Sequence, residues 1–184
     1  RLLFRFLKEL LAIDHERGVQ VLPSWRQWLV NTDNEDTNEF QTKHDYADYR
    51  ALNCCLLPFS AMYRYVMKLD LSMVEIEAVT PIQHQACAVI GLVNDYWSWP
   101  KGKAVLGDQL DRLMNGVSVL MRLDGVDERQ ALERVKSLAI EYESNLIKLC
   151  YDLPAADGNV RQDFRWHVHA HIRIVSKNGL WGSP

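Results

Sequence analysis

Two oxygen-bearing side chains lie four residues apart at the end of an apolar run. Asn94 and Ser98 follow the run at residues 86–93, and Asp95 lies between them. If the run is helical, Asn94 and Ser98 share one face about one turn apart. Their oxygens can then bind Mg²⁺, which takes oxygen ligands and keeps water and substrate phosphates as its other ligands. The alternative is a buried helix in which both side chains only satisfy backbone groups.

A guanidinium is the second candidate group. Arg50 precedes Asn94 by 44 residues, and its forked donors can bind two diphosphate oxygens at once. The alternative is a solvated or salt-bridged arginine. Arg64 is a weaker candidate in the same segment.

Pro58 interrupts the apolar segment that follows Arg50. Because proline has no amide hydrogen, it cannot donate to the carbonyl of Cys54. We predict a kink and a free carbonyl around Asn53 and Cys54, where the alternative is a kink that serves packing only.

The stretch NDYWSWPK at residues 94–101 resembles the N-D-x-x-S-x-x-x-E metal motif of class I terpene synthases, particularly the cyclase domains of bifunctional fungal enzymes. In that family the Asn, Ser and Glu bind one Mg²⁺ of a three-metal cluster that holds a prenyl diphosphate. The resemblance implies that Asn94 and Ser98 are metal ligands and that Asp95 supports them without touching the metal. The sequence departs from the motif at the Glu position, which is Gly102.

The resemblance also assigns roles near the predicted kink. In the family, a helix breaks just after an arginine that senses pyrophosphate, and an exposed carbonyl there faces the allylic carbon of the substrate. Arg50 would be the sensor, Asn53 the linker and Cys54 the carbonyl donor. Lys101 matches a basic residue that often precedes the family's Glu and reaches the diphosphate; its alternative role is plain solvation.

Aromatic side chains would complete the site. The resemblance implies that Tyr96, Trp97 and Trp181 line the substrate cavity, where ring faces can stabilise carbocations. Trp181 ends the segment NGLW, which resembles the end of the family's last helix. Tyr96, Trp97 and Trp99 lie so close in sequence that two of them must point away from any one cavity.

Hydrophobic periodicity predicts helices and no strands. Thr42 and Asp127 are expected helix caps, Thr80 and Pro81 are expected to begin a central helix ending near Trp99, and residues 101–108 are expected to form a connector. Further helices are expected at residues 2–17, near 25–29, from Ser72, at 110–125 and up to Asn178. We expect an all-α class I terpenoid synthase fold, with antiparallel helices around a central apolar cavity.

Three histidines, His167, His169 and His171, lie close together near the end of the chain. Only His167 and His171 would share a helix face, and no H-E-x-x-H signature is present. We predict packing or surface roles for them.

Composition narrows the function class. The 184 residues are 48% hydrophobic and 24% charged, with a formal net charge of −3, which fits one soluble globular domain without a nucleic-acid partner. No apolar run approaches the roughly 18 residues of a membrane span. Four cysteines without a C-x-x-C pair indicate reduced thiols and a cytoplasmic location.

The function implied by the resemblance is Mg²⁺-dependent ionisation and cyclisation of a C20 or C25 prenyl diphosphate, geranylgeranyl or geranylfarnesyl diphosphate, with release of pyrophosphate. Residues 1–184 would form the C-terminal part of a terpene cyclase domain. The family's aspartate-rich motif would lie upstream and its Arg-Tyr pair downstream, so residues 1–184 alone are expected to be inactive. The partners that the resemblance allows are a fused prenyltransferase domain and a second copy of the chain.

Two rival interpretations remain. A chain-elongating prenyltransferase has the same helical fold class, but it uses two aspartate-rich motifs, and no D-D-x-x-D occurs here. A non-catalytic helical homologue or interaction domain is the other, because Gly102 removes one metal ligand.

Overall fold

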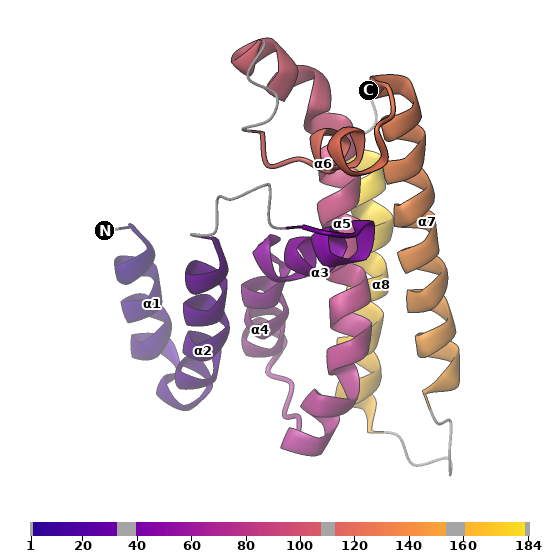
Figure 1. Cartoon of the computed structure of the whole chain (residues 1–184). Coiled ribbons are helices and arrows are strands. Elements are labelled where there is room, and N and C mark those ends of the chain that lie inside the picture. Colours follow the sequence, from indigo (N-terminus) through magenta and orange to yellow (C-terminus); the bar gives the residue numbers. More distant parts are fainter. Residues whose placement is uncertain (1, 33–39, 108–112, 154–160, 183–184) are drawn as a thin grey trace.

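The chain folds into a bundle of α-helices in a computed structural model that describes residues 2–32, 40–107, 113–153 and 161–182. In Figure 1, α5 and α8 run side by side through the middle, α7 covers one side, and α1, α2 and α4 lie on the other. The helices of the described ranges are α1 (Leu2–Ile13), α2 (His15–Thr32), α3 (Lys43–Asn53), α4 (Leu56–Met67), α5 (Met73–Leu106), α6 (Gly116–Asp124), α7 (Glu128–Asp152) and α8 (Gln162–Gly182). The expected all-α fold is confirmed.

Side-chain caps fix where several helices begin. Thr42 and Asp127 cap α3 and α7 as predicted, because each side chain accepts a hydrogen bond from the amide three residues later. Ser72 caps α5 in the same way. These caps satisfy amides that have no partner within the helix itself.

Helix α5 is one continuous element, and the predicted boundary at Thr80 is wrong. The Thr80 hydroxyl donates to the carbonyl of Ile76 (3.1 Å), so it bonds back into the helix rather than capping a new one. Pro81 and Pro100 both lie inside the helix. The predicted connector at 101–108 is also helical as far as Leu106, and Gly107 ends it with a positive φ of 55°.

Other predicted boundaries shift for local reasons. The first helix ends at Ile13 because the Asp14 carboxylate accepts the amide of Arg17 (3.1 Å) and starts α2. Helix α6 begins at Gly116, because the Asn115 side chain accepts the amide of Val117 (2.9 Å) and caps the helix there. The predicted start at residue 110 lies outside the described residues. Helix α8 continues past Asn178 to Gly182.

The apolar core surrounds α5. Its buried side chains, including Val79, Ile82 and Leu92, pack with those of α3, α6, α7 and α8. A second, smaller cluster joins α1, α2 and α4 through Leu10, Val21 and Ala61. All four cysteines are free thiols. Within the described ranges, no helix combines the length and apolar character needed to span a membrane.

Candidate active site

The chain breaks between α3 and α4, as predicted from Pro58. Cys54 leaves helical geometry (φ −65°, ψ 140°), and α4 starts at Leu56. The indole of Trp28 on α2 donates to the carbonyl of Asn53 (2.8 Å), which holds one side of the break in place. Pro58 has no amide hydrogen for the carbonyl of Cys54. The role of that carbonyl toward a substrate stays a prediction.

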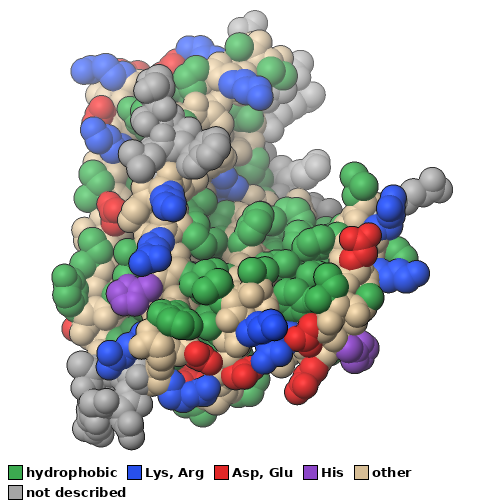
Figure 2. Space-filling view, turned by 180° about the vertical axis from the view of Figure 1, so that it is seen from behind, with side chains coloured by type: hydrophobic (Ala, Val, Ile, Leu, Met, Phe, Trp, Pro, Cys, Tyr) green, Lys and Arg blue, Asp and Glu red, His purple; other side chains and the backbone are tan. Residues whose placement is uncertain are grey.

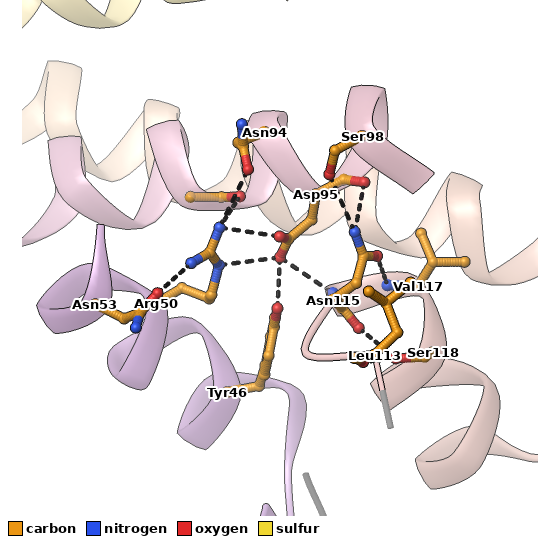
Figure 3. Close-up of polar contacts among 12 residues, drawn as sticks. Tyr46, Arg50, Asn53, Asn94, Asp95, Ser98, Leu113, Asn115, Val117 and Ser118 are labelled. Atoms are coloured by element: carbon orange, nitrogen blue, oxygen red, sulfur yellow. Dashed lines mark hydrogen bonds and ion pairs between the residues drawn. The ribbon is translucent and has the colours of Figure 1, made fainter. Parts of the chain in front are cut away.

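The carboxylate of Asp95 is the centre of a buried polar cluster, shown in Figure 3. Arg50 binds it through two nitrogens, with Nη2 3.0 Å from Oδ1 and Nε 3.2 Å from Oδ2. The Tyr46 hydroxyl (2.5 Å) and the Gly116 amide (3.0 Å) donate to Oδ2. Two helices and the start of a third therefore meet at one charged group.

Burial and ionic contacts set the charge states in this cluster. Burial raises the pKa of Asp95, whereas Arg50 and Tyr46 oppose that rise. Burial disfavours the charge of Arg50, but Asp95, Tyr46 and Cys54 together oppose it, and the pKa of Arg50 is raised. Burial and Asp95 hold the pKa of Tyr46 well above its usual value, so its hydroxyl stays a donor. Arg50 and Asp95 thus form an ion pair without net charge, to which the Tyr46 hydroxyl donates a hydrogen bond.

Two glycines allow the helices to approach this closely. A Cβ on Gly91 would lie 3.0 Å from the Cβ of Arg50. A Cβ on Gly116 would lie 3.1 Å from the Tyr46 ring and 3.2 Å from Oδ2 of Asp95. Larger residues at either position would push Arg50 or Tyr46 away from Asp95.

Asn94 and Ser98 lie one turn apart on α5, beside this cluster (Figure 3). Asn94 Oδ1 accepts a long hydrogen bond from Arg50 Nη2 (3.4 Å). The Asn115 amide donates to the backbone carbonyl of Asp95 (2.9 Å) and to Ser98 Oγ (3.4 Å). Arg50 also donates to Asn53 Oδ1 through Nη1 (2.6 Å). The structure therefore brings Arg50, Asn53, Asn94 and Ser98 together around Asp95.

The sequence predictions did not include Tyr46, Asn115 or Gly116 as site residues. Tyr46 lies one turn before Arg50, a spacing that places both side chains on one helix face. Asn115-Gly116 before an apolar run is a helix-start signal. Neither signal reveals that the Tyr46 hydroxyl and the Gly116 amide donate to Asp95.

Gly102 continues the face that carries Asn94 and Ser98, because α5 remains helical through Pro100. A Cβ on Gly102 would lie 2.7 Å from Cδ2 of Leu113, so this leucine occupies the space of a larger residue. Lys101 is exposed, and none of the described acidic groups forms an ion pair with it.

A wide apolar groove of about 1010 Å³ lies on the face of the molecule formed by α1, α4 and parts of α2, α5 and α8. Ile90, one turn before Asn94, and Cys55, next to the break, line it. Figure 2 shows apolar side chains gathered across a hollowed face of the molecule. The remaining lining residues come from α1, α2, α4 and α8: Leu2, Leu3, Phe6, Trp25, Leu56, Phe59, Met62, Tyr63, Val66, Ile174 and Asn178.

Two of the three predicted cavity aromatics, Tyr96 and Trp97, are not among the residues that line the groove. Tyr96 and Trp97 contact each other edge to face, with ring centroids 5.1 Å apart. Trp99 is buried, and its indole donates to Glu128 (2.9 Å). The Trp181 side chain lies outside the described side chains.

The structure confirms packing roles for His167 and His171 and a surface position for His169. His167 and His171 are buried between α4 and α8, where Ser60 Oγ lies 3.5 Å and 3.0 Å from their Nε2 atoms. Burial lowers the pKa of His167 to about 3 and that of His171 to about 4, so both are neutral near pH 7. His169 on the same helix is exposed.

Comparison with known protein families shows which family the chain belongs to. The model of terpene synthase family 2, C-terminal metal binding, matches residues 21–144, which is more than half of the chain. The chain belongs to this terpene synthase family. The matched range includes the α3–α4 break, the whole of α5 and the start of α7.

Fungal terpene synthases are among the similar proteins. The chain is 31% identical over its full length to the bifunctional terpene synthase FUP1 of Fusarium proliferatum, and 29% identical over 95% of its length to the sesterterpene synthase btcA of Colletotrichum orbiculare. In both cases it spans 25% of the relative. Aristolochene synthase of Penicillium roqueforti has the same fold (TM-score 0.78, 19% identity), matching 98% of this chain and 60% of that enzyme.

The polar groups of this terpene synthase chain suit a hard cation only in part. Asn94 Oδ1 and Ser98 Oγ each accept one long hydrogen bond of 3.4 Å, which leaves lone pairs for a metal. No cluster of three His, Cys, Asp or Glu side chains occurs among the described residues. The two oxygens fit an ion such as Mg²⁺ that takes its other ligands from water and phosphate.

Proposed function

We propose that residues 1–184 are the C-terminal part of a terpene cyclase domain that ionises and cyclises a C20 or C25 prenyl diphosphate with Mg²⁺ and releases pyrophosphate. The observation that carries this proposal is the position of Arg50. Its guanidinium is fixed by Asp95, reaches Asn94 and lies beside the α3–α4 break. The guanidinium, the two oxygen-bearing side chains that could bind a metal, and the apolar groove are thus close to one another in this chain.

Arg50 would contact the diphosphate through Nη1. Asp95 takes Nε and Nη2, and Asn53 takes one Nη1 hydrogen, which leaves the other for an incoming oxygen. Asp95 also holds the guanidinium in one orientation, so little conformational entropy is lost on binding. A donor held in this way can stabilise the charge that develops as the C–O bond breaks.

The charge balance explains why a metal would be needed. Because Asp95 already neutralises Arg50, the pair attracts a diphosphate less than a free arginine would. Mg²⁺ bound to Asn94 and Ser98 would supply the missing positive charge. Lys101, exposed three residues after Ser98, would add a further cation near the diphosphate.

The groove would hold the isoprenoid chain. Its lining is almost entirely apolar, which favours a hydrocarbon and keeps water from carbocations. Phe6, Trp25 and Tyr63 supply ring faces there. Fusion to a prenyltransferase domain is supported by the bifunctional relative and by the greater length of both fungal relatives.

Calorimetry with pyrophosphate tests the proposal. The chain is expected to bind pyrophosphate in the presence of Mg²⁺ and to lose at least tenfold in affinity without the metal. Arg50→Gln and Asn94→Ala should each weaken Mg²⁺-dependent binding about tenfold or more, about 1.4 kcal/mol. Arg134→Gln, an exposed arginine on α7, is the matched control. Equal binding by all four proteins would sink the proposal.

Gly102 favours one alternative, a homologue with an impaired metal site. Gly102→Glu alone would force the new Cβ against Leu113, so Leu113→Ala is added to make room. If a ligand is missing, the double variant should bind Mg²⁺ and pyrophosphate about tenfold more tightly than the Leu113→Ala control. An unchanged affinity would mean that position 102 is not a metal ligand here.

A further inference from the structure

A second hollow lies on the opposite face of α4 from the groove. It has a volume of about 300 Å³ and is lined by α2, α4 and the first half of α5, with Ala51 and Leu52 of α3 beside them. Leu57, Ala61 and Arg64 face this pocket, whereas Phe59, Met62 and Tyr63 face the groove. The α2–α4–α5 pocket is therefore separate from the candidate active site.

Four helices line the pocket, with Ala51 and Leu52 as the contribution of α3. On α2 its lining residues recur three or four apart, as expected of one helix face: Gln20, Pro23, Ser24 and Gln27. The lining residues of α5 recur in the same way: Ile76, Thr80, Gln83, His84 and Cys87. The lining contains no Asp or Glu.

Arg64 is the cation of this pocket. It is partly buried, and no carboxylate of the described residues lies within 4.0 Å of it. Its one described side-chain contact is a long one, from Nη1 to Nε2 of neutral His167 (3.4 Å). Burial lowers the pKa of Arg64, and no acidic group opposes that effect. A desolvated guanidinium without a counter-ion favours an anion.

The other polar side chains of the pocket differ in whether they can donate a hydrogen bond to an anion. The hydroxyls of Ser24 and Thr80 donate to carbonyls of their own helices. Gln83 lines the same pocket, and its side-chain amide can donate two hydrogens. A guanidinium and an amide that line one small cavity can bind a carboxylate or phosphate group at more than one oxygen.

We propose that the α2–α4–α5 pocket binds a small anion bearing a carboxylate or a phosphate group, with Arg64 as its counter-ion and Gln83 as a hydrogen-bond donor. The volume of about 300 Å³ accommodates an anion of a few heavy atoms. The bound anion would contact the face of α4 that lies behind the groove wall.

Titration of the chain with inorganic phosphate and with succinate, without Mg²⁺ and at constant ionic strength, tests this site. Saturable binding of at least one probe is expected, and the preferred probe tells phosphate from carboxylate recognition. Arg64→Gln should weaken that binding at least tenfold, whereas Arg50→Gln should leave it within twofold. Gln83→Leu should weaken it severalfold.

The same titrations can also overturn the proposed anion site. Loss of binding in Arg50→Gln with retention in Arg64→Gln would assign the anion to the candidate active site and overturn the proposal. Binding that no variant alters, or no saturable binding of either probe, would overturn it too. Circular dichroism of each variant verifies folding, and Arg64→Lys, which keeps the charge, should retain binding better than Arg64→Gln.

Discussion

Replacing Asp95 with alanine is expected to lower the free energy of unfolding by about 3–5 kcal/mol, because it leaves the guanidinium of Arg50 buried without a counter-ion. The Arg50 side chain is 11% exposed and that of Asp95 is 2% exposed, so water cannot replace the lost carboxylate. The Tyr46 hydroxyl and the Gly116 amide lose their acceptor as well. Urea denaturation at pH 7 measures the change.

Two further variants separate this ionic effect from a general loss of packing. Asn94→Ala, on the exposed side of the same helix, should change stability by less than about 0.5 kcal/mol. The double variant Arg50→Met with Asp95→Ala should recover part of the loss, because no unpaired charge remains. A cost below about 1 kcal/mol for Asp95→Ala would contradict the role assigned to this cluster.

Acid is expected to destabilise the chain through His167 and His171. Their folded pKa values of about 3 and about 4 lie below the ordinary 6.5, so the unfolded chain takes up protons first as the pH falls. The stabilisation is present above pH 6.5 and is lost as the pH falls toward about 4. Each histidine contributes about 1.4 kcal/mol per pH unit, or up to about 4 kcal/mol for both between pH 7 and pH 5.

Urea midpoints at pH 7 and pH 5 measure this loss. Replacing both His167 and His171 with glutamine should remove most of the pH dependence, although it lowers stability at pH 7. His169→Gln, on the exposed side of α8, should leave the pH dependence unchanged. A wild-type protein equally stable at both values would show that the two buried histidines are not held neutral.

Local signals predicted part of this site. The i, i+4 spacing of Asn94 and Ser98 depends only on α5 being helical, and the break at Cys54 follows from the missing amide hydrogen of Pro58. The caps at Thr42 and Asp127 likewise depend on residues three apart. These features need no information from distant parts of the chain.

The partners of Asp95 could not be predicted in this way. They come from Tyr46 and Gly116, 49 and 21 residues away, and depend on how α3 and α6 pack on α5. The predicted helix boundaries at Pro81 and near Pro100 failed for the same reason, because tertiary packing keeps α5 helical across both prolines, against local propensity. The groove residues on α1 and α8 are likewise set by packing.

A crystal structure of the chain grown with Mg²⁺ and pyrophosphate would test the central claim most directly. We expect pyrophosphate in contact with the Arg50 guanidinium, and Mg²⁺ bound to Asn94 Oδ1 and Ser98 Oγ, at the rim of the groove. Pyrophosphate bound away from Arg50, or Mg²⁺ without contact to Asn94 and Ser98, would contradict the account.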